Sequence, residues 1–396
     1  MTDPLLRFRN EFPILADSTY LVSNSLGAMP RGVPGRLAEY AEQWATRGVR
    51  AWADGWWSMP VSVGDSIAPL IGARDGEVAM VPNVSHAQAQ ILSALDYGNG
   101  RDTIVMTELD FPSVRYVYDE LATRLGARVV VVPSEDGVGV DEERLIAAID
   151  ERTRLVSISH VLFRSAYVMD VARITAHARD AGALVAIDAY HSVGVLPVDV
   201  RALGVDFLTG GVLKWLCGGP GGCFLWVRPE VGADVAPSLT GWQAHMHPFA
   251  FESEMHYAEG SWRWLGGTPV IPALFAATEG PRLLREAGMD AVRAKSLRQT
   301  SRLIDLADAR GFTTTVPRDP ARRGGTVAFD VPYAREVAQA LLARGVIVDF
   351  RPGAGIRVAP HFYTSDDELD AAVGTIDDIL ANEEWRRYVH TRSVVT

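Results

Sequence analysis

The chain has 396 residues, of which 48% are hydrophobic and 22% are charged, and its net charge is −11. This composition is typical of a globular protein large enough for two domains, and the negative charge argues against a nucleic-acid partner. No run of 18 apolar residues occurs, and the polar start of the chain lacks the pattern of a signal peptide. We therefore expect no membrane partner and a cytoplasmic location.

Metal-ligating residues lack the spacing of a metal site. The two cysteines, Cys217 and Cys223, flank a glycine-rich turn and do not have zinc spacing, which fits a reducing compartment. His245 and His247 are two residues apart, but no third ligand follows at a suitable distance. The sequence therefore predicts no metal.

An alternation of strands and helices starts near residue 64, after an irregular arm with one helix at about 35–47. Strands are predicted at 78–81, 103–106, 128–132, 155–159, 183–187, 205–210 and 223–227. Helices are predicted between them, at 85–95, 113–125, 142–149 and 171–181. Such alternation predicts a three-layer α/β fold, with a mainly parallel sheet and helices on both faces.

The pattern changes at about residue 271, where a long helical stretch leads to a smaller unit. That unit is expected to hold strands at 326–329 and 356–358 and helices at 334–344 and 366–381. We therefore divide the chain into an arm (1–60), a large cofactor-binding domain (61–270) and a small C-terminal α+β domain (271–396). The loop 318–325, rich in charge, Pro and Gly, is the best candidate for an internal linker.

A carboxylate and an amine are predicted at one edge of the large sheet. Asp188 directly follows the apolar run 183–187, and Lys214 lies between the stretch 205–210 and the glycine-rich turn 218–222. This pair suits pyridoxal phosphate, because the amine can form a Schiff base while the carboxylate keeps the ring nitrogen protonated.

Each member of this pair has an ordinary structural alternative. Lysines usually lie on the surface, but the neighbours Val212 and Trp215 are apolar, which favours burial and a more nucleophilic amine. Asp188 could cap a helix, although its place after five apolar residues argues against this role.

Two further segments are weaker candidates for cofactor contacts. Val84 and Ser85 lie between a strand and a helix, where backbone amides and a hydroxyl can bind phosphate. Phe111 follows the strand 103–106 and could stack on a cofactor ring, although most phenylalanines belong to the core.

Several motifs, taken in order, resemble kynureninase and, more distantly, the class V aminotransferase group of pyridoxal phosphate enzymes. The resemblance runs from Tyr20 to about Leu380. Its motifs lie at 20–27, 64–67, 111–113, 204–207, 241–245, 267–269 and 355–360. It implies fold type I, pyridoxal 5′-phosphate as the cofactor, an amino-acid substrate and a homodimer with shared active sites.

The resemblance also implies roles for residues at matching positions. Lys214, Asp188 and His191 match the catalytic residues, and His191 is expected to contact the cofactor or its phenolic oxygen. The implied cofactor contacts are Val84, Ser85, Phe111, Asp188, His191, Lys214, Trp242 and Thr268, of which Trp242 and Thr268 are expected to reach across the dimer interface. Arg357 matches the arginine that holds the substrate carboxylate, and Ser25 and Tyr190 are further candidate substrate contacts.

Three departures from kynureninase weaken the case for kynurenine as the substrate. Leu213 stands where that family has Tyr, Val114 where it has Asp, and 164–167 where it has a Tyr-Thr-Gly run. Leu213 cannot donate a hydroxyl near the phosphate. Candidate replacements for the missing polar groups are Tyr190, Arg164, Tyr167 and His160.

The sequence therefore predicts a pyridoxal phosphate enzyme acting on an L-amino acid or an amino-acid conjugate. We expect cleavage of a Cβ bond, carbon–carbon or carbon–sulfur, through an external aldimine, and a natural substrate other than kynurenine. The alternatives are a true kynureninase, a class V aminotransferase, an oxidative decarboxylating deaminase of secondary metabolism, and an inactive cofactor-binding module. An arginine that holds the carboxylate near the ring plane leaves the Cα–H bond to break, which favours β-chemistry over decarboxylation.

Overall fold

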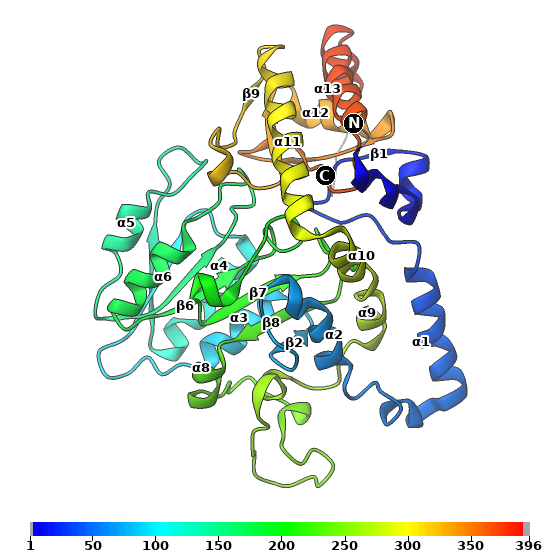
Figure 1. Ribbon diagram of the computed structural model, residues 1–396. Coiled ribbons are helices and arrows are strands. Elements are labelled where there is room, and N and C mark those ends of the chain that lie inside the picture. The colour runs from blue at the N-terminus through cyan, green and yellow to red at the C-terminus, as the bar shows by residue number, and fades with distance from the viewer. Residues whose placement is uncertain (1–2, 391–396) are drawn as a thin grey trace.

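The computed structural model describes residues 3–390 and has a large central sheet enclosed by helices, with a smaller unit of sheet and helices beside it (Figure 1). The strands of the large sheet lie in the order β2 (Val78–Val81), β8 (Cys223–Val227), β7 (Phe207–Gly211), β6 (Leu184–Asp188), β5 (Thr153–Ser159), β3 (Thr103–Thr107) and β4 (Arg128–Val132). Strands β7, β6, β5, β3 and β4 pair in parallel, whereas β8 is antiparallel to both β2 and β7.

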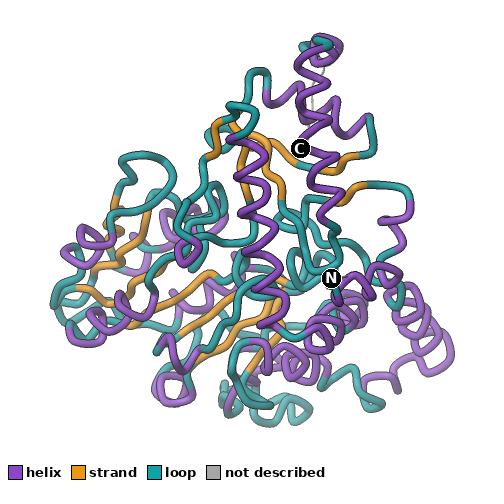
Figure 2. The backbone as a smooth tube through the Cα atoms, turned by 45° about the horizontal axis from the view of Figure 1, so that its top comes forward, coloured by secondary structure: helices purple, strands orange, loops and turns teal. Residues whose placement is uncertain are grey.

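Both faces of this sheet are buried, which explains why its strands are continuous apolar runs. Alternate residues enter two separate cores: Ile104 and Ala186 lie in one, and Val105 and Ile187 in the other. Helices α3 (Val84–Ser93) and α4 (Pro112–Leu121) contribute to the first core, while α2 (Met59–Ile67) and α6 (Val171–Asp180) contribute to the second. The tube view shows the strands of the sheet with helices on either side of them (Figure 2).

The smaller unit is built on an antiparallel sheet in the order β12 (Asp349–Arg351), β13 (Gly355–Val358), β10 (Val327–Asp330) and β9 (Thr313–Thr314). Its core is shared with helices α11 (Met289–Asp308), α12 (Ala334–Ala343) and α13 (Asp366–Ala381). Strand β1 (Thr19–Tyr20) of the N-terminal arm pairs in parallel with β11 (Val346–Ile347). The arm is thereby tied to the C-terminal unit.

The remaining helices connect and flank these two sheets (Figure 1). They are α1 (Val33–Arg47), α5 (Glu142–Ala147), α7 (Val200–Leu203), α8 (Pro229–Asp234), α9 (Ile271–Ala276) and α10 (Glu279–Ala287). Within residues 3–390, no helix is both long enough and apolar enough to cross a membrane.

The predicted fold class is confirmed, and the seven predicted strands of the large sheet all form. The loop 318–325, expected to be a linker, contacts both units. The backbone N–H of Gly324 donates to the Ala166 carbonyl at 2.7 Å. Arg323 is buried, and its side chain donates to Thr300 and Ser301 of α11 and to the Arg318 carbonyl. The divisions at residues 60 and 270 stay predictions.

Candidate active site

The predicted amine, carboxylate and imidazole converge at the carboxyl ends of β6 and β7. Lys214 Nζ lies 2.6 Å from His191 Nε2, and 5.2 Å from the centroid of the Phe111 ring. Tyr190 lies on another side of the amine, with its ring centroid 5.5 Å from Nζ. Residues from the loops after three different strands, β3, β6 and β7, therefore surround one nitrogen atom.

The charges of Asp188 and Lys214 are both affected by burial. Asp188 is buried, and its Oδ1 accepts a hydrogen bond from the Tyr190 backbone N–H at 2.9 Å. Burial raises the pKa of Asp188, while the backbone hydrogen bond and the charge of Lys214 act in the opposite direction. Burial lowers the pKa of Lys214, against the attraction of Asp188. The amine therefore loses its proton more easily than an exposed lysine does.

His191 is held in its neutral form. Its pKa is well below the usual value because of burial first, and then because of the positive charges of Lys214 and Arg357. A neutral imidazole has one acceptor nitrogen, and Nε2 can accept a hydrogen bond from the protonated Lys214 amine at the observed 2.6 Å. The neutral ring can therefore orient the amine through this hydrogen bond without adding a second positive charge beside it.

Two glycines allow the backbone to close around the lysine. The Gly27 N–H donates to the Leu213 carbonyl at 2.7 Å, and a Cβ at Gly27 would lie only 2.1 Å from the Lys214 carbonyl oxygen. A Cβ at Gly211 would lie 2.0 Å from the Tyr190 ring. Any larger residue at either position would push away the lysine loop or the tyrosine.

The start of α3 provides a second part of the site. Asn83 caps this helix by accepting the His86 N–H at 3.0 Å, which leaves the amides of Val84 and Ser85 at the positive end of the helix. The Tyr190 phenol lies beside the Val84 backbone and the Cys223 thiol, and burial raises its pKa well above the usual value. Tyr190 therefore borders this helix end, although it was predicted as a substrate contact.

Arg357 enters the site from β13 of the smaller unit, but two of its edges are already engaged. Its Nε donates to Asp349 Oδ1 at 2.8 Å, its Nη2 pairs with Asp349 Oδ2, and its Nη1 donates to the Phe163 carbonyl at 2.7 Å. Of the five N–H groups, one on Nη1 and one on Nη2 are left for a ligand. Asp349 is fully buried and lies opposite Arg357 in the sheet register.

Sequence reasoning missed Asp349 and Asn24. Asp349 could have been found only by recognising the hairpin that pairs it with Arg357. Asn24 is buried in the turn that closes on the lysine loop, and neither polar atom of its side chain has a hydrogen-bond partner in the described residues. Its neighbour Ser25, the predicted substrate contact, is half-buried.

Trp242 and Thr268 are not brought to this group within one chain. Thr268 is exposed, and Trp242 is 42% exposed in an aromatic cluster with Trp57, at 4.9 Å, and Phe249, at 5.4 Å between ring centroids. Both residues line open grooves of the surface. Their predicted roles depend on a second chain and stay predictions.

The two substituted family positions differ in their surroundings. Leu213 is half-buried beside Lys214, so a side chain there can reach the site. Val114 is buried in the core between α3 and α4, with Tyr118 as a member of the same core. Its place in that core explains why an apolar residue is stable there.

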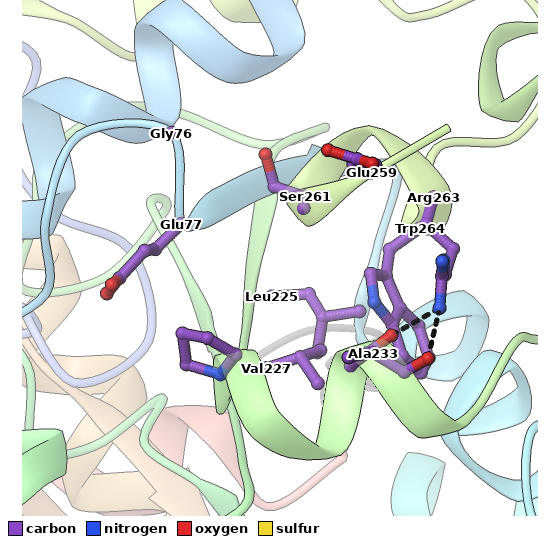
Figure 3. A pocket seen from close by; sticks show the side chains of 12 residues that line it. Gly76, Glu77, Leu225, Val227, Ala233, Glu259, Ser261, Arg263 and Trp264 are labelled. Atoms are coloured by element: carbon purple, nitrogen blue, oxygen red, sulfur yellow. Dashed lines mark hydrogen bonds between the residues drawn. The ribbon is translucent and has the colours of Figure 1, made fainter. Parts of the chain in front are cut away.

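A cavity of about 460 Å³ lies elsewhere, lined in part by Glu77, Leu225, Val227 and Trp264 (Figure 3). Leu225 and Val227 belong to the end of β8 away from Cys223 and the Lys214 loop. Arg263 in its wall donates to backbone carbonyls, including that of Ala233 (Figure 3). These bonds stabilise the loop, and the cavity is separate from the amine.

Residues 19–362 match the model of the aminotransferase class-V family. The chain belongs to that family. It is 34% identical to a kynureninase of Burkholderia pseudomallei over all of this chain and 97% of the relative, and 34% identical to a kynureninase of Pseudomonas fluorescens over 97% and 94%.

Solved structures agree on the fold. A cysteine desulfurase from Thermococcus onnurineus superposes with a TM-score of 0.85 at 22% identity, over 96% of this chain and 99% of the other. The cystine C–S lyase C-DES gives 0.84 at 21% identity, over 93% and 99%. The chain is thus a kynureninase-like, class V pyridoxal phosphate protein of fold type I, and the predicted family, fold and cofactor are confirmed at this level.

The residues present fit pyridoxal phosphate. The amine of Lys214 is close to an aromatic face, Asp188 has one carboxylate oxygen engaged by a single backbone N–H, and a capped helix of ten residues presents its positive end nearby. These are the groups needed for an aldehyde, a ring nitrogen and a phosphate, respectively.

Proposed function

We propose that this protein uses pyridoxal phosphate, held by Lys214 and Asp188, to cleave a Cβ bond of an amino acid. The observation that carries the proposal is the group of Lys214, His191 and Asp188 within one buried site that Arg357 closes from the smaller unit. The arrangement provides an amine, an acid and a carboxylate-binding group, which together suit amino-acid chemistry.

Each residue has a distinct task in this proposal. The cofactor, when bound, withdraws electrons from the substrate carbon atoms joined to it. Lys214 removes the proton from Cα, because its lowered pKa leaves part of the amine unprotonated near neutral pH. His191 positions that amine. With the cofactor bound, Asp188 would hold a proton on its ring nitrogen, and Phe111, close to the amine, would pack against the ring.

Tyr190 is proposed as a replacement for the tyrosine missing at Leu213. Its phenol lies near the Val84 backbone, at the helix end proposed to bind phosphate. A hydroxyl at this place can donate to a phosphate oxygen, which Leu213 cannot. The high pKa of Tyr190 keeps the proton on the phenol, as a donor needs.

Arg357 favours β-chemistry over decarboxylation. Its two remaining N–H groups can hold a carboxylate bidentately, and Asp349 fixes the plane of the guanidinium from the other edge. Asn24, whose side-chain amide has no hydrogen-bond partner within residues 3–390, is a further candidate for this carboxylate. A carboxylate fixed in this way leaves Cα–H as the bond that breaks.

Kynureninase activity is the second candidate, because kynureninases of Burkholderia pseudomallei and Pseudomonas fluorescens match nearly the whole chain at 34% identity. Against it stands Leu213, which removes a hydroxyl beside the amine. A class V aminotransferase reaction is the third candidate, and it would use Lys214, Asp188 and Arg357 in the same way up to Cα deprotonation.

A substrate panel tests these candidates together. Purified protein with cofactor is incubated with kynurenine, cysteine, aspartate and glutamate, and alanine, pyruvate, ammonia, keto acid and carbon dioxide are measured separately. Alanine or pyruvate, formed with a stoichiometric leaving group, supports Cβ cleavage. Keto acid formed only with an amino acceptor supports transamination, and carbon dioxide alone contradicts the role given to Arg357.

A homodimer with shared sites is also proposed. Apolar side chains stand out on the loop that carries Trp242, with Phe249 and Phe251 exposed by 60% and 77%. Covering such a surface favours association. Sedimentation equilibrium of wild type and Phe251→Glu tests it: the wild type should be dimeric and the variant weaker, and an active wild-type monomer would refute shared sites.

A further inference from the structure

An aromatic pair leads outward from the lysine amine to a single arginine. The Phe111 ring, 5.2 Å from Lys214 Nζ, meets the Phe163 ring edge-to-face at 5.2 Å between centroids. The Arg164 guanidinium carbon lies 5.4 Å from the Phe163 ring centroid. Arg164 therefore lies two aromatic rings out from the amine, beyond Phe111 and Phe163.

Arg164 has no acidic partner in the part of the chain that the structure describes. Its guanidinium makes no ion pair and donates no hydrogen bond to any residue between 3 and 390, although Arg144, Arg152 and Arg173 elsewhere on the surface each pair with a carboxylate. It is half-buried and faces the turn between β12 and β13, where its Nη1 would lie 3.6 Å from a Cβ at Gly353. The smaller unit thus closes one side of it.

The charges around this turn are unbalanced. Arg357 and Arg351 share one carboxylate, that of Asp349, which is 3.2 Å from Arg351 Nη2. Both arginines act on Lys214 as well, because each lowers the pKa of its amine. Arg164 adds a third guanidinium without adding an acid. These three arginines have the single carboxylate of Asp349 among them. A substrate whose only acidic group is its α-carboxylate would therefore leave an excess of positive charge at this turn.

We infer that Arg164 binds a second acidic group, at the side-chain end of the substrate, so that the substrate class is an amino acid with an anionic side chain. The inference rests on the proposed function, because the α-carboxylate is taken to lie on Arg357. Carboxylates and sulfonates share the chemistry that a planar guanidinium recognises. The departure of the sequence from kynureninase at 164–167 is consistent with this substrate, since kynurenine has no acidic side chain.

Ligand binding tests the inference independently of turnover. The ligands are L-glutamate against L-glutamine, L-aspartate against L-asparagine, and L-cysteate as the sulfonate. Dissociation constants are measured from the change in the visible absorption of the bound cofactor and from thermal stabilisation of the protein. At least one acid should bind about tenfold or more tightly than its amide, as expected for a hydrogen bond between charged groups.

The variants assign that preference to Arg164. Arg164→Gln should bring the acid-to-amide ratio close to one, and Arg164→Lys should restore part of it through charge alone. Arg7→Gln is the matched control, because Arg7 also lies over a neighbouring ring, that of Phe8, at 4.8 Å and is exposed. It should keep the wild-type ratio.

Two results would overturn the inference: wild-type protein that binds each acid no better than its amide, or a preference that survives in Arg164→Gln. Failure of the proposed function would look different, since it would appear as protein in which Lys214→Ala leaves the cofactor absorption unchanged. If L-cysteate binds as tightly as the carboxylates, Arg164 recognises the negative charge of the side chain. If only the carboxylates bind, Arg164 recognises the planar geometry of the carboxylate.

Discussion

The floor and the rim of the site are held in different ways. The floor, which we define as Phe111, Asp188, His191 and Lys214, lies at the end of β6 and on the loops that follow β3, β6 and β7 of the large sheet. The rim, defined as Phe163, Arg164 and the turn 351–355, lies on a longer loop and on the smaller sheet. The floor matches the kynureninase pattern, whereas the rim departs from it at Arg164.

This difference suggests which parts decide chemistry and which decide substrate. Buried strand ends place functional groups with little freedom, so the floor can keep one chemistry while loops change. The rim joins two units through the bond from Arg357 to the Phe163 carbonyl. Substitutions in the floor should therefore abolish reaction or cofactor binding, and those in the rim should alter selectivity.

The largest effect is expected for Lys214→Ala. The chain has only two lysines, so Lys295→Arg serves as the control: Lys295 donates to the Phe362 carbonyl at 2.7 Å and pairs with Asp3. Lys214→Ala should lose the cofactor absorption band and reduce turnover by about 10⁴-fold or more. Borohydride treatment followed by peptide mass analysis should place the cofactor on Lys214, and cofactor recovered on Lys295 would contradict the assignment.

Leu213→Tyr changes the residue before Lys214 to the one found in kynureninase. A phenol beside Lys214 restores a proton donor, which should raise kynurenine turnover by about tenfold or more. Anthranilate fluorescence measures the rate, and Leu213→Phe is the control that adds the ring without the hydroxyl. Val114 should not be changed with it, because an Asp in that core would be buried without a partner. Equal rates in Tyr and Phe variants would show that the hydroxyl has no role.

Asp349→Asn tests the connection between floor and rim. The substitution leaves Arg357 charged but loosely oriented, so KM should rise about tenfold with a smaller change in kcat. Because the pair is buried, unfolding in urea should also show a loss of about 3 kcal/mol. Asp330→Asn, on an exposed residue of β10, is the control. An unchanged KM would mean that the substrate carboxylate does not lie on Arg357.

Asp188 and Lys214 were predictable from sequence because each follows an apolar strand, and strand ends in parallel sheets converge at one edge. The resemblance to kynureninase indicated His191. Asp349 and Asn24 were not predictable. Asp349 acts through a pairing of two short strands, β12 and β13, whose three and four residues are too few for a periodic pattern. Asn24 depends on a turn whose partner, the Lys214 loop, is nearly 190 residues away, a proximity that only tertiary packing creates.

The smallest effect is expected for His160→Gln, which concerns stability rather than reaction. His160 is buried after β5, its Nδ1 has no partner in the described residues, and burial, together with Arg293, lowers its pKa to about 4. The unfolded chain takes up a proton near pH 6.5 but the folded chain does not, so this stability is complete above pH 6.5 and is lost as pH falls toward 4. Between pH 7.5 and 5, wild type should lose about 2 kcal/mol more than the variant in urea unfolding. Parallel pH profiles would mean that the imidazole finds a hydrogen-bond partner or water that keeps its pKa near 6.5, and that His160 faces the site rather than the core.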